Sequence, residues 1–194
     1  PAVSERVAAP AEIHTITETM DVTQSKLAIG YRTSSEDSPA LLLANLIFGG
    51  YSNSKLFLNV REKLSLCYFA SSSYHRSKGI ITVSSGIEAK NYDVACREIA
   101  AQLKAVQDGA FEPWELEGAR SCILSSLRSR EDSAGRLEEY YLGQAATGLW
   151  EGTDELIEQL KAVTPERVAA AAQTIQPDTI YFLTGKEETE HDVE

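Results

Sequence analysis

Three histidines, His14, His75 and His191, are the side chains most suited to metal chemistry. Zinc needs about four ligands, and helical zinc motifs place two histidines four residues apart on one face. No two histidines here have that spacing, so neither H-E-x-x-H nor its inverse, H-x-x-E-H, occurs. We expect His14 in a strand, His75 exposed at a hairpin tip and His191 in a mobile tail. The sequence therefore predicts no metal site and no cofactor in this chain.

The serines and cysteines do not form a nucleophilic site either. No G-x-S-x-G elbow is present, and no histidine is placed with an acid that could activate a serine. Cys67, Cys96 and Cys122 are far apart and lie in apolar patterns, which predicts buried free thiols. Residues 49–55, GGYSNSK, lack the spacing of a phosphate-binding loop and predict a turn between two helices. We therefore predict no catalytic residue in this chain.

Residues 48–68, FGGYSNSKLFLNVREKLSLCY, contain the most distinctive pattern of the chain. A Gly-Gly turn precedes a helix that we expect to be capped near 52–53. Leu56, Val60 and Leu64 recur one turn apart, so they predict the inward face of that helix.

Arg61 and Lys63 lie off the apolar stripe of this helix, and Tyr68 follows it. Arg61 falls near the helix C-terminus, where a cation complements the helix dipole, and it could also pair with Glu62 on the surface. Tyr68 opens the next strand, where a half-buried aromatic side chain is common. From position alone, these structural roles explain Arg61 and Tyr68.

The elements around this segment predict an α+β domain. A hairpin and several strands separated by helices favour a mixed or antiparallel sheet covered by helices on one face. The strand at 26–32 is apolar enough to predict a central strand buried on both faces. The expected strands are 12–19, 26–32, 67–74, 80–87 and 179–184, and the expected helices are 38–50, 52–64, 92–106, 133–147 and those beginning at Glu112-Pro113, Thr153 and Thr164-Pro165.

Length and composition divide the chain into three parts. The 194 residues are enough for one domain with a substantial core. Residues 1–11 are small and proline-containing, so we expect a linker or lead-in. Residues 12–185 form the single predicted domain, and the acidic residues 186–194 predict a disordered tail.

The net charge of −11 argues against nucleic acid as a partner, because phosphate binding needs clustered Lys and Arg. The longest apolar stretch, 39–48, is about half of the roughly 20 residues that a membrane span requires, so we expect no membrane partner. No secretory signal is visible at the start, and we expect a cytoplasmic protein.

Residues 49–68 resemble a signature of the pitrilysin- or insulinase-like (M16) zinc peptidases. The pattern GG-x-x-S-x-L-F-x-x-V/I-R-E-K-x-x-L-x-Y is typical of their C-terminal half, which binds no zinc. The likeness extends to the helix starts at 112–116 and 164–168 and to the last strand, and within the family it is greatest to bacterial members that lack a zinc motif, such as the YmfF-like proteins. The matching residues are Gly49, Gly50, Ser54, Leu56, Phe57, Val60, Arg61, Glu62, Lys63, Leu66 and Tyr68.

This resemblance implies a LuxS/M16 metallopeptidase-like fold and a role in holding peptide substrate. In the family, one half binds zinc and the other supplies an arginine and a tyrosine, which here would be Arg61 and Tyr68. An arginine fork and a phenol can hydrogen-bond a peptide carbonyl and stabilise developing oxyanion charge. The peptide would add as an extra strand beside residues 67–74. Zinc is then expected only in a partner domain, in the same chain or in a partner subunit of a dimeric assembly.

Two hypotheses follow for the function. The leading one is a non-catalytic, substrate-holding half of an M16 zinc peptidase, which does not hydrolyse peptides by itself because it has no zinc to activate water. The alternative is an inactive structural or assembly module with the same fold. An independent serine or cysteine hydrolase has little support in the sequence.

Overall fold

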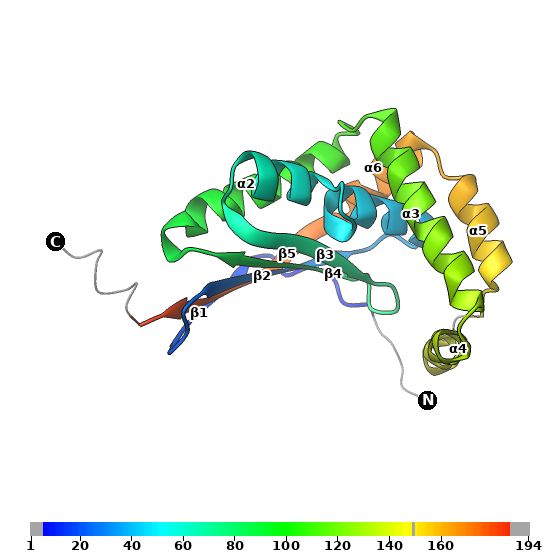
Figure 1. The fold of residues 1–194 in the computed structure, drawn as a ribbon, viewed down its shortest axis with the longest axis horizontal. Helices are drawn as coiled ribbons and strands as arrows, with labels where there is room; N and C mark the ends of the chain where they lie inside the picture. The colour runs from blue at the N-terminus through cyan, green and yellow to red at the C-terminus, as the bar shows by residue number, and fades with distance from the viewer. Residues whose placement is uncertain (1–5, 149, 187–194) are drawn as a thin grey trace.

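The computed structural model describes residues 6–148 and 150–186, and it is built on one five-stranded sheet (Figure 1). The strand order is β1-β5-β2-β4-β3. β1 runs parallel to β5, and the other neighbouring pairs are antiparallel, so the sheet is mixed, as predicted. The strands are β1 (His14–Met20), β2 (Ser25–Thr33), β3 (Cys67–His75), β4 (Ile80–Ile87) and β5 (Ile175–Gly185).

The helices lie on one face of this sheet, which confirms the predicted α+β arrangement (Figure 1). Between the sheet and the helices lies a single apolar cluster, to which strands and helices both contribute. The helices are α1 (Ser38–Asn45), η1 (Leu46–Gly50), η2 (Leu56–Lys63), η3 (Ala89–Asn91), α2 (Tyr92–Gln107), α3 (Pro113–Glu131), α4 (Ala134–Thr147), α5 (Thr153–Lys161) and α6 (Pro165–Gln173).

Strand β2 is central, as predicted, but it is buried on one face only. Leu27, Ile29 and Tyr31 face the helices and are buried, whereas Lys26, on the other face, is exposed. The prediction of burial on both faces is wrong because the helices that cover the sheet pack on one side of it (Figure 1).

Two helix starts show how local side chains set the element boundaries. The cap of α1 is Asp37 rather than the expected Ser38, and its Oδ1 accepts a hydrogen bond from the backbone N–H of Ala40 at 3.2 Å. Thr164 caps α6 as expected, because its hydroxyl accepts a hydrogen bond from the N–H of Arg167. Each cap satisfies a donor that the first helical turn leaves unpaired.

The two ends of the chain are only partly described. Residues 1–5 of the predicted lead-in lie outside the described residues, and so do residues 187–194 of the predicted acidic tail, His191 included. From the described part of the lead-in, the Arg6 side chain donates hydrogen bonds to the backbone oxygens of Ser35 and Arg76. Within the described residues, no helix has the length and apolar character needed to cross a membrane.

Candidate functional site

The candidate site lies where η2 meets the beginning of β3. Leu56 and Val60 are fully buried and hold η2 against the sheet, as the apolar stripe predicted. Leu64, expected on the same face, is 42% exposed. That expectation is wrong because η2 ends at Lys63 and the chain then turns away through Ser65, whose φ is 50°.

The Gly-Gly pair brings η1 close to β3. A Cβ on Gly49 would lie 2.9 Å from the backbone nitrogen of Ser72, in β3, so only glycine permits this approach. Beside it, the Ser72 hydroxyl donates a hydrogen bond to Asn45 Oδ1 at 2.8 Å. One helix ends here and the next begins, as predicted, and the close packing fixes where η2 can start.

The start of η2 is anchored to α3 by a buried ion pair. Lys55 Nζ lies 3.1 Å from Glu115 Oε1, and both side chains are at most 10% exposed. The Glu115 carboxylate also accepts a hydrogen bond from the N–H of Glu112 at 2.8 Å, so it has two partners. The residue at the N-cap of η2 is Lys55, which forms no side-chain cap, rather than the expected residues 52–53, and the nearby Ser54 hydroxyl accepts a hydrogen bond from the N–H of Phe57 at 3.4 Å.

A β-bulge places Tyr68 on the surface. Cys67 pairs with Ile87 and Phe69 with Gly86, so Tyr68 is the extra residue of β3. Bulges redirect a side chain relative to the regular alternation of a strand. Tyr68 is 60% exposed, so the alternative in which it is only a half-buried strand residue does not hold.

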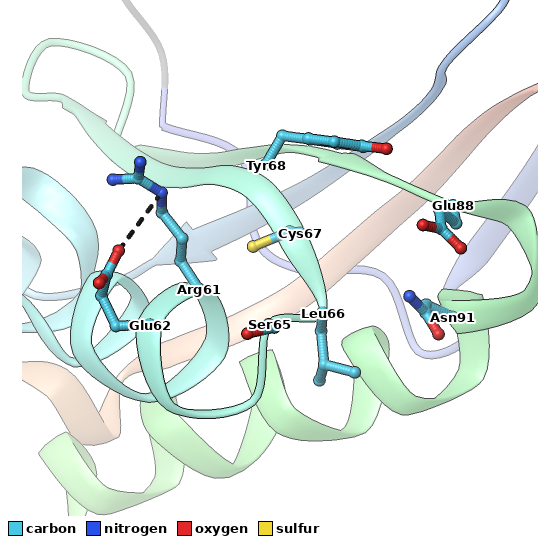
Figure 2. A pocket seen from close by; sticks show the side chains of 8 residues that line it. All are labelled: Arg61, Glu62, Ser65, Leu66, Cys67, Tyr68, Glu88 and Asn91. Atoms are coloured by element: carbon cyan, nitrogen blue, oxygen red, sulfur yellow. Dashed lines mark ion pairs between the residues drawn. The ribbon is translucent and has the colours of Figure 1, made fainter.

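Arg61 and Tyr68 line the same open pocket, which has a volume of about 390 Å³. Figure 2 shows the phenol of Tyr68 extending along β3 away from the Arg61 guanidinium, so the two side chains do not touch. Between them lie Cys67 and the turn from η2 into β3. The pocket is lined by Arg61, Glu62, Ser65, Leu66, Cys67, Tyr68, Glu88 and Asn91.

The Arg61 guanidinium is held from two sides. Its Cζ lies 4.8 Å from the centre of the Phe57 ring, and its Nε lies 3.6 Å from Glu62 Oε1, which confirms the predicted pairing with Glu62 (Figure 2). The Arg61 side chain is 41% exposed. Stacking and pairing limit its rotation, and the guanidinium has five N–H donors in all.

Cys67 is the side chain of this pocket with a shifted pKa. Burial raises the pKa of its thiol above the ordinary value, and a hydrogen bond with Ser85 and the charge of Arg61 act in the opposite direction. The net shift is upward, so the thiol is protonated at neutral pH. A protonated thiol is a poor nucleophile.

Neither the histidines nor the cysteines gather into a reactive cluster. His14 is exposed in β1 and His75 is exposed in β3, at opposite edges of the sheet, and the exposure of His75 was predicted. Within residues 6–148 and 150–186, no three His, Cys, Asp or Glu side chains are placed to hold a metal ion. The three cysteines are free, but Cys122 is exposed and Cys67 and Cys96 are half-buried, so the prediction of buried thiols fails for Cys122.

Sequence reasoning missed three residues of the pocket: Ser65, Glu88 and Asn91. Ser65 has an unusual positive φ that no local sequence pattern predicts. Glu88 and Asn91 follow β4 and reach the pocket only because β3 and β4 pair. A signal for them could have come from the hairpin prediction, which already placed the end of the second strand beside the start of the first.

Comparison with known proteins identifies the family to which this chain is similar. The sequence model described as "Peptidase M16 inactive domain" matches residues 3–121. A curated relative from Bacillus subtilis (strain 168), named "Probable inactive metalloprotease YmfF", is 42% identical over 171 residues, which cover 86% of this chain and 40% of the relative. The chain thus spans about 40% of the length of the curated relatives that it matches.

Two solved structures share the fold over most of the chain. A conserved protein from Enterococcus faecalis V583 has a TM-score of 0.86 at 33% identity, covering 93% of this chain and 44% of that one. The peptidase M16 inactive domain from Pseudomonas fluorescens has a TM-score of 0.76 at 17% identity, covering 94% of this chain and 46% of that one. The predicted M16-like fold is confirmed.

Proposed function

Because this chain belongs to the peptidase M16 family and matches its inactive domain, we propose that it is a substrate-holding half of a larger M16 protein. In this proposal, Arg61 and Tyr68 contact the backbone of an extended peptide. The observation that carries it is that both side chains line one open pocket at the start of an edge strand.

The position of β3 supports peptide binding. It is the last strand of the sheet and, among the described strands, pairs with β4 alone, so no described strand pairs with its other edge. An extended peptide can pair with such an edge as an additional strand, in which main-chain hydrogen bonds supply much of the affinity. The net charge of −11 favours peptides that carry basic residues.

The properties of the two side chains fit such a contact. The guanidinium of Arg61 is oriented by Phe57 and Glu62 and is partly exposed. Tyr68 is the most exposed tyrosine among the large apolar side chains at the surface, and its hydroxyl can donate to a carbonyl. Because both side chains line one pocket, the proposal places one extended peptide in contact with both.

Hydrolysis would need a second domain. We propose a zinc-bearing M16 domain, either elsewhere in the same chain or in a partner subunit of a dimeric assembly, because the matched relatives are more than twice as long as this chain. Such a domain would supply the zinc-activated water. We also propose that the protein acts in the cytoplasm, which cell fractionation with an antibody to this domain would test.

The test uses the protein that contains this chain, assembled with its zinc-bearing domain. Arg61→Ala should lower kcat/KM for an unstructured peptide by about 100-fold, and Tyr68→Phe by about tenfold, because each removes a donor to the peptide. The Arg128→Ala variant, which removes an exposed cation from α3, is the control. Turnover by both site variants at the unchanged rate, with unchanged thermal unfolding, would remove the proposed role.

A second candidate is an inactive structural or assembly module. It is favoured by the name of the 42% identical relative, which describes that protein as a probable inactive metalloprotease. This candidate predicts that Arg61→Ala has no effect, whereas a charge on the exposed sheet face disrupts assembly. Ile16, which is 46% exposed in β1, is a suitable position, and Ile16→Glu should then abolish complex formation in size-exclusion chromatography.

A further inference from the structure

A second cavity lies at the other end of β3, among the helices. Its volume is about 370 Å³, at the small end of the range of ligand pockets. Leu42 and Leu46 line it from α1 and η1, Ile123 and Leu127 from α3, and Leu156 from α5. This cavity, which we call the helical cavity, is therefore mostly apolar.

A polar hollow of about 420 Å³ adjoins the helical cavity, and the two share Ser126, Arg130 and Tyr140. Arg136 and Glu139, from α4, complete the lining of the hollow. The hollow therefore has two arginines and one carboxylate, in a protein whose net charge is −11. The apolar helical cavity beside this cationic hollow suits a ligand with an aliphatic part and an anionic part.

Arg130 is the group that lacks a partner. Its Nη1 is buried and has no hydrogen-bond acceptor in the described part of the protein. Its guanidinium lies over the Tyr140 ring, with Cζ 4.2 Å from the ring centre, so the side chain is held in place. A buried donor without an acceptor costs free energy, and an anionic acceptor would recover it.

Three neighbouring polar side chains, Arg76, Tyr140 and Gln144, have partners on Glu151. Arg76 forms an ion pair with the Glu151 carboxylate. The Tyr140 hydroxyl and the Gln144 side-chain amide both donate to the Glu151 backbone oxygen, at 3.1 and 2.8 Å. These contacts connect α4 to the β3–β4 hairpin through Glu151, whereas the buried Arg130 Nη1 has no acceptor among the described residues and could receive one from a ligand.

We propose that the helical cavity binds an aliphatic group that carries a carboxylate, and that its occupant is the C-terminal residue of a peptide. The aliphatic side chain would enter among Leu46, Ile123 and Leu127, and the terminal carboxylate would accept from Arg130. Charge complementarity selects this end of a peptide, because a terminal amine would meet the same arginine unfavourably.

The choice of a peptide as the source of the carboxylate rests on the proposed function. Tyr68 lies near the beginning of β3, and Arg76, which lines the helical cavity, follows its last residue. The strand between them has nine residues, or roughly 30 Å at about 3.3 Å per residue. A peptide paired along this edge could thus have its end at the helical cavity.

The first experiment probes the cavity alone with N-acetyl-leucine, which is too short to reach Arg61 or Tyr68. In NMR titrations of the 194-residue chain, it should bind with a Kd of about 2 mM and shift resonances of α3 and α4. N-acetyl-leucinamide lacks the charge and N-acetylglycine lacks the aliphatic group, and each should bind at least about tenfold more weakly. Equal binding of the amide, or no saturation by N-acetyl-leucine, would overturn the proposal.

Substitutions test whether Arg130 makes the contact. Arg130→Gln should weaken the binding of N-acetyl-leucine about tenfold. Arg128 is an exposed arginine on the same helix, and Arg128→Gln should leave the binding unchanged. Cys122 lines the helical cavity, so bound N-acetyl-leucine should also slow its alkylation while leaving that of Cys67 unchanged. An unchanged affinity in Arg130→Gln with unchanged thermal unfolding would contradict the assignment, and octanoate binding tighter than N-acetyl-leucine would identify a fatty acid instead of a peptide end.

If N-acetyl-leucine binds as predicted while Arg61→Ala has no effect on peptide turnover, binding at the helical cavity is supported and the proposed substrate-holding role is contradicted. The reverse result would support that role and contradict binding at the helical cavity. The two experiments therefore fail independently.

Discussion

Arg61 and Cys67 line the same pocket, and the charge of the first acts on the second. Burial raises the thiol pKa, while the nearby guanidinium favours the thiolate and opposes that rise. The pKa of Cys67 therefore reports whether the Arg61 side chain occupies the place that the proposed peptide contact requires.

The first prediction concerns the pH at which Cys67 reacts. In a Cys96→Ala/Cys122→Ala background, the midpoint of iodoacetamide alkylation should lie above the ordinary thiol pKa of 9.0. Arg61→Ala should move the midpoint to still higher pH, because removal of the cation disfavours the thiolate. Arg128→Ala should leave it in place. A midpoint that Arg61→Ala does not change would show that the guanidinium lies elsewhere in solution.

The exposure of Tyr68 could not be predicted from its own sequence neighbourhood. Regular alternation along β3 predicts a side chain that is partly covered, and the bulge exists only in the register between Cys67–Phe69 and Ile87–Gly86. The pairing of Arg61 with Glu62, in contrast, was predictable, because adjacent residues near a helix end need no tertiary contact to meet.

Among the elements, the junction of η1 and β3 sets the geometry of the site. Gly49 lets the backbones approach, and Asn45 and Ser72 are joined by a hydrogen bond across the same contact. Since η2 begins a few residues later, a shift at this junction would move Arg61 relative to Tyr68.

Replacement of Gly49 tests this junction. Gly49→Ala should lower the free energy of unfolding by about 1–3 kcal/mol, because the added Cβ would overlap Leu56 and the Ser72 backbone. Gly143→Ala is the matched control: apart from the neighbouring backbone of α4 itself, no described atom lies within 4 Å of its added Cβ, and it should stabilise by about 0.5–1 kcal/mol. Chemical denaturation measures both. Equal effects of the two substitutions would contradict the close approach of Gly49 to the backbone of Ser72.

Elements with local signals were the ones that sequence reasoning placed well. The Thr164-Pro165 start of α6 and the β3–β4 hairpin with Gly79 at φ 61° depend on neighbouring residues only. The strand order and the π-helical hydrogen bonding of η1 and η2 depend on pairing and packing between distant segments. The pocket combines both kinds of feature: the family resemblance singled out Arg61 and Tyr68, whereas Ser65, Glu88 and Asn91 were missed.

For the molecule as a whole, the open sheet edge and the one-sided layer of helices are the features that matter. No described strand pairs with the outer edge of β3, and the chain spans only about 40% of the length of its curated relatives. A domain of this shape suits an arrangement in which another domain faces it across a bound peptide. Its charge of −11 would attract basic peptides, and their binding should weaken with added salt.

The most direct test measures peptide binding by the 194-residue chain itself. The probe is a fluorescein-labelled, lysine-containing peptide whose C-terminus is amidated, so that the helical cavity does not contribute, and fluorescence anisotropy gives its Kd. We predict saturable binding that weakens about tenfold in Arg61→Ala and about threefold in Tyr68→Phe, with no change in Arg128→Ala. An Arg61→Ala/Tyr68→Phe double variant that unfolds at the same temperature as the parent and binds the peptide equally well would contradict the account.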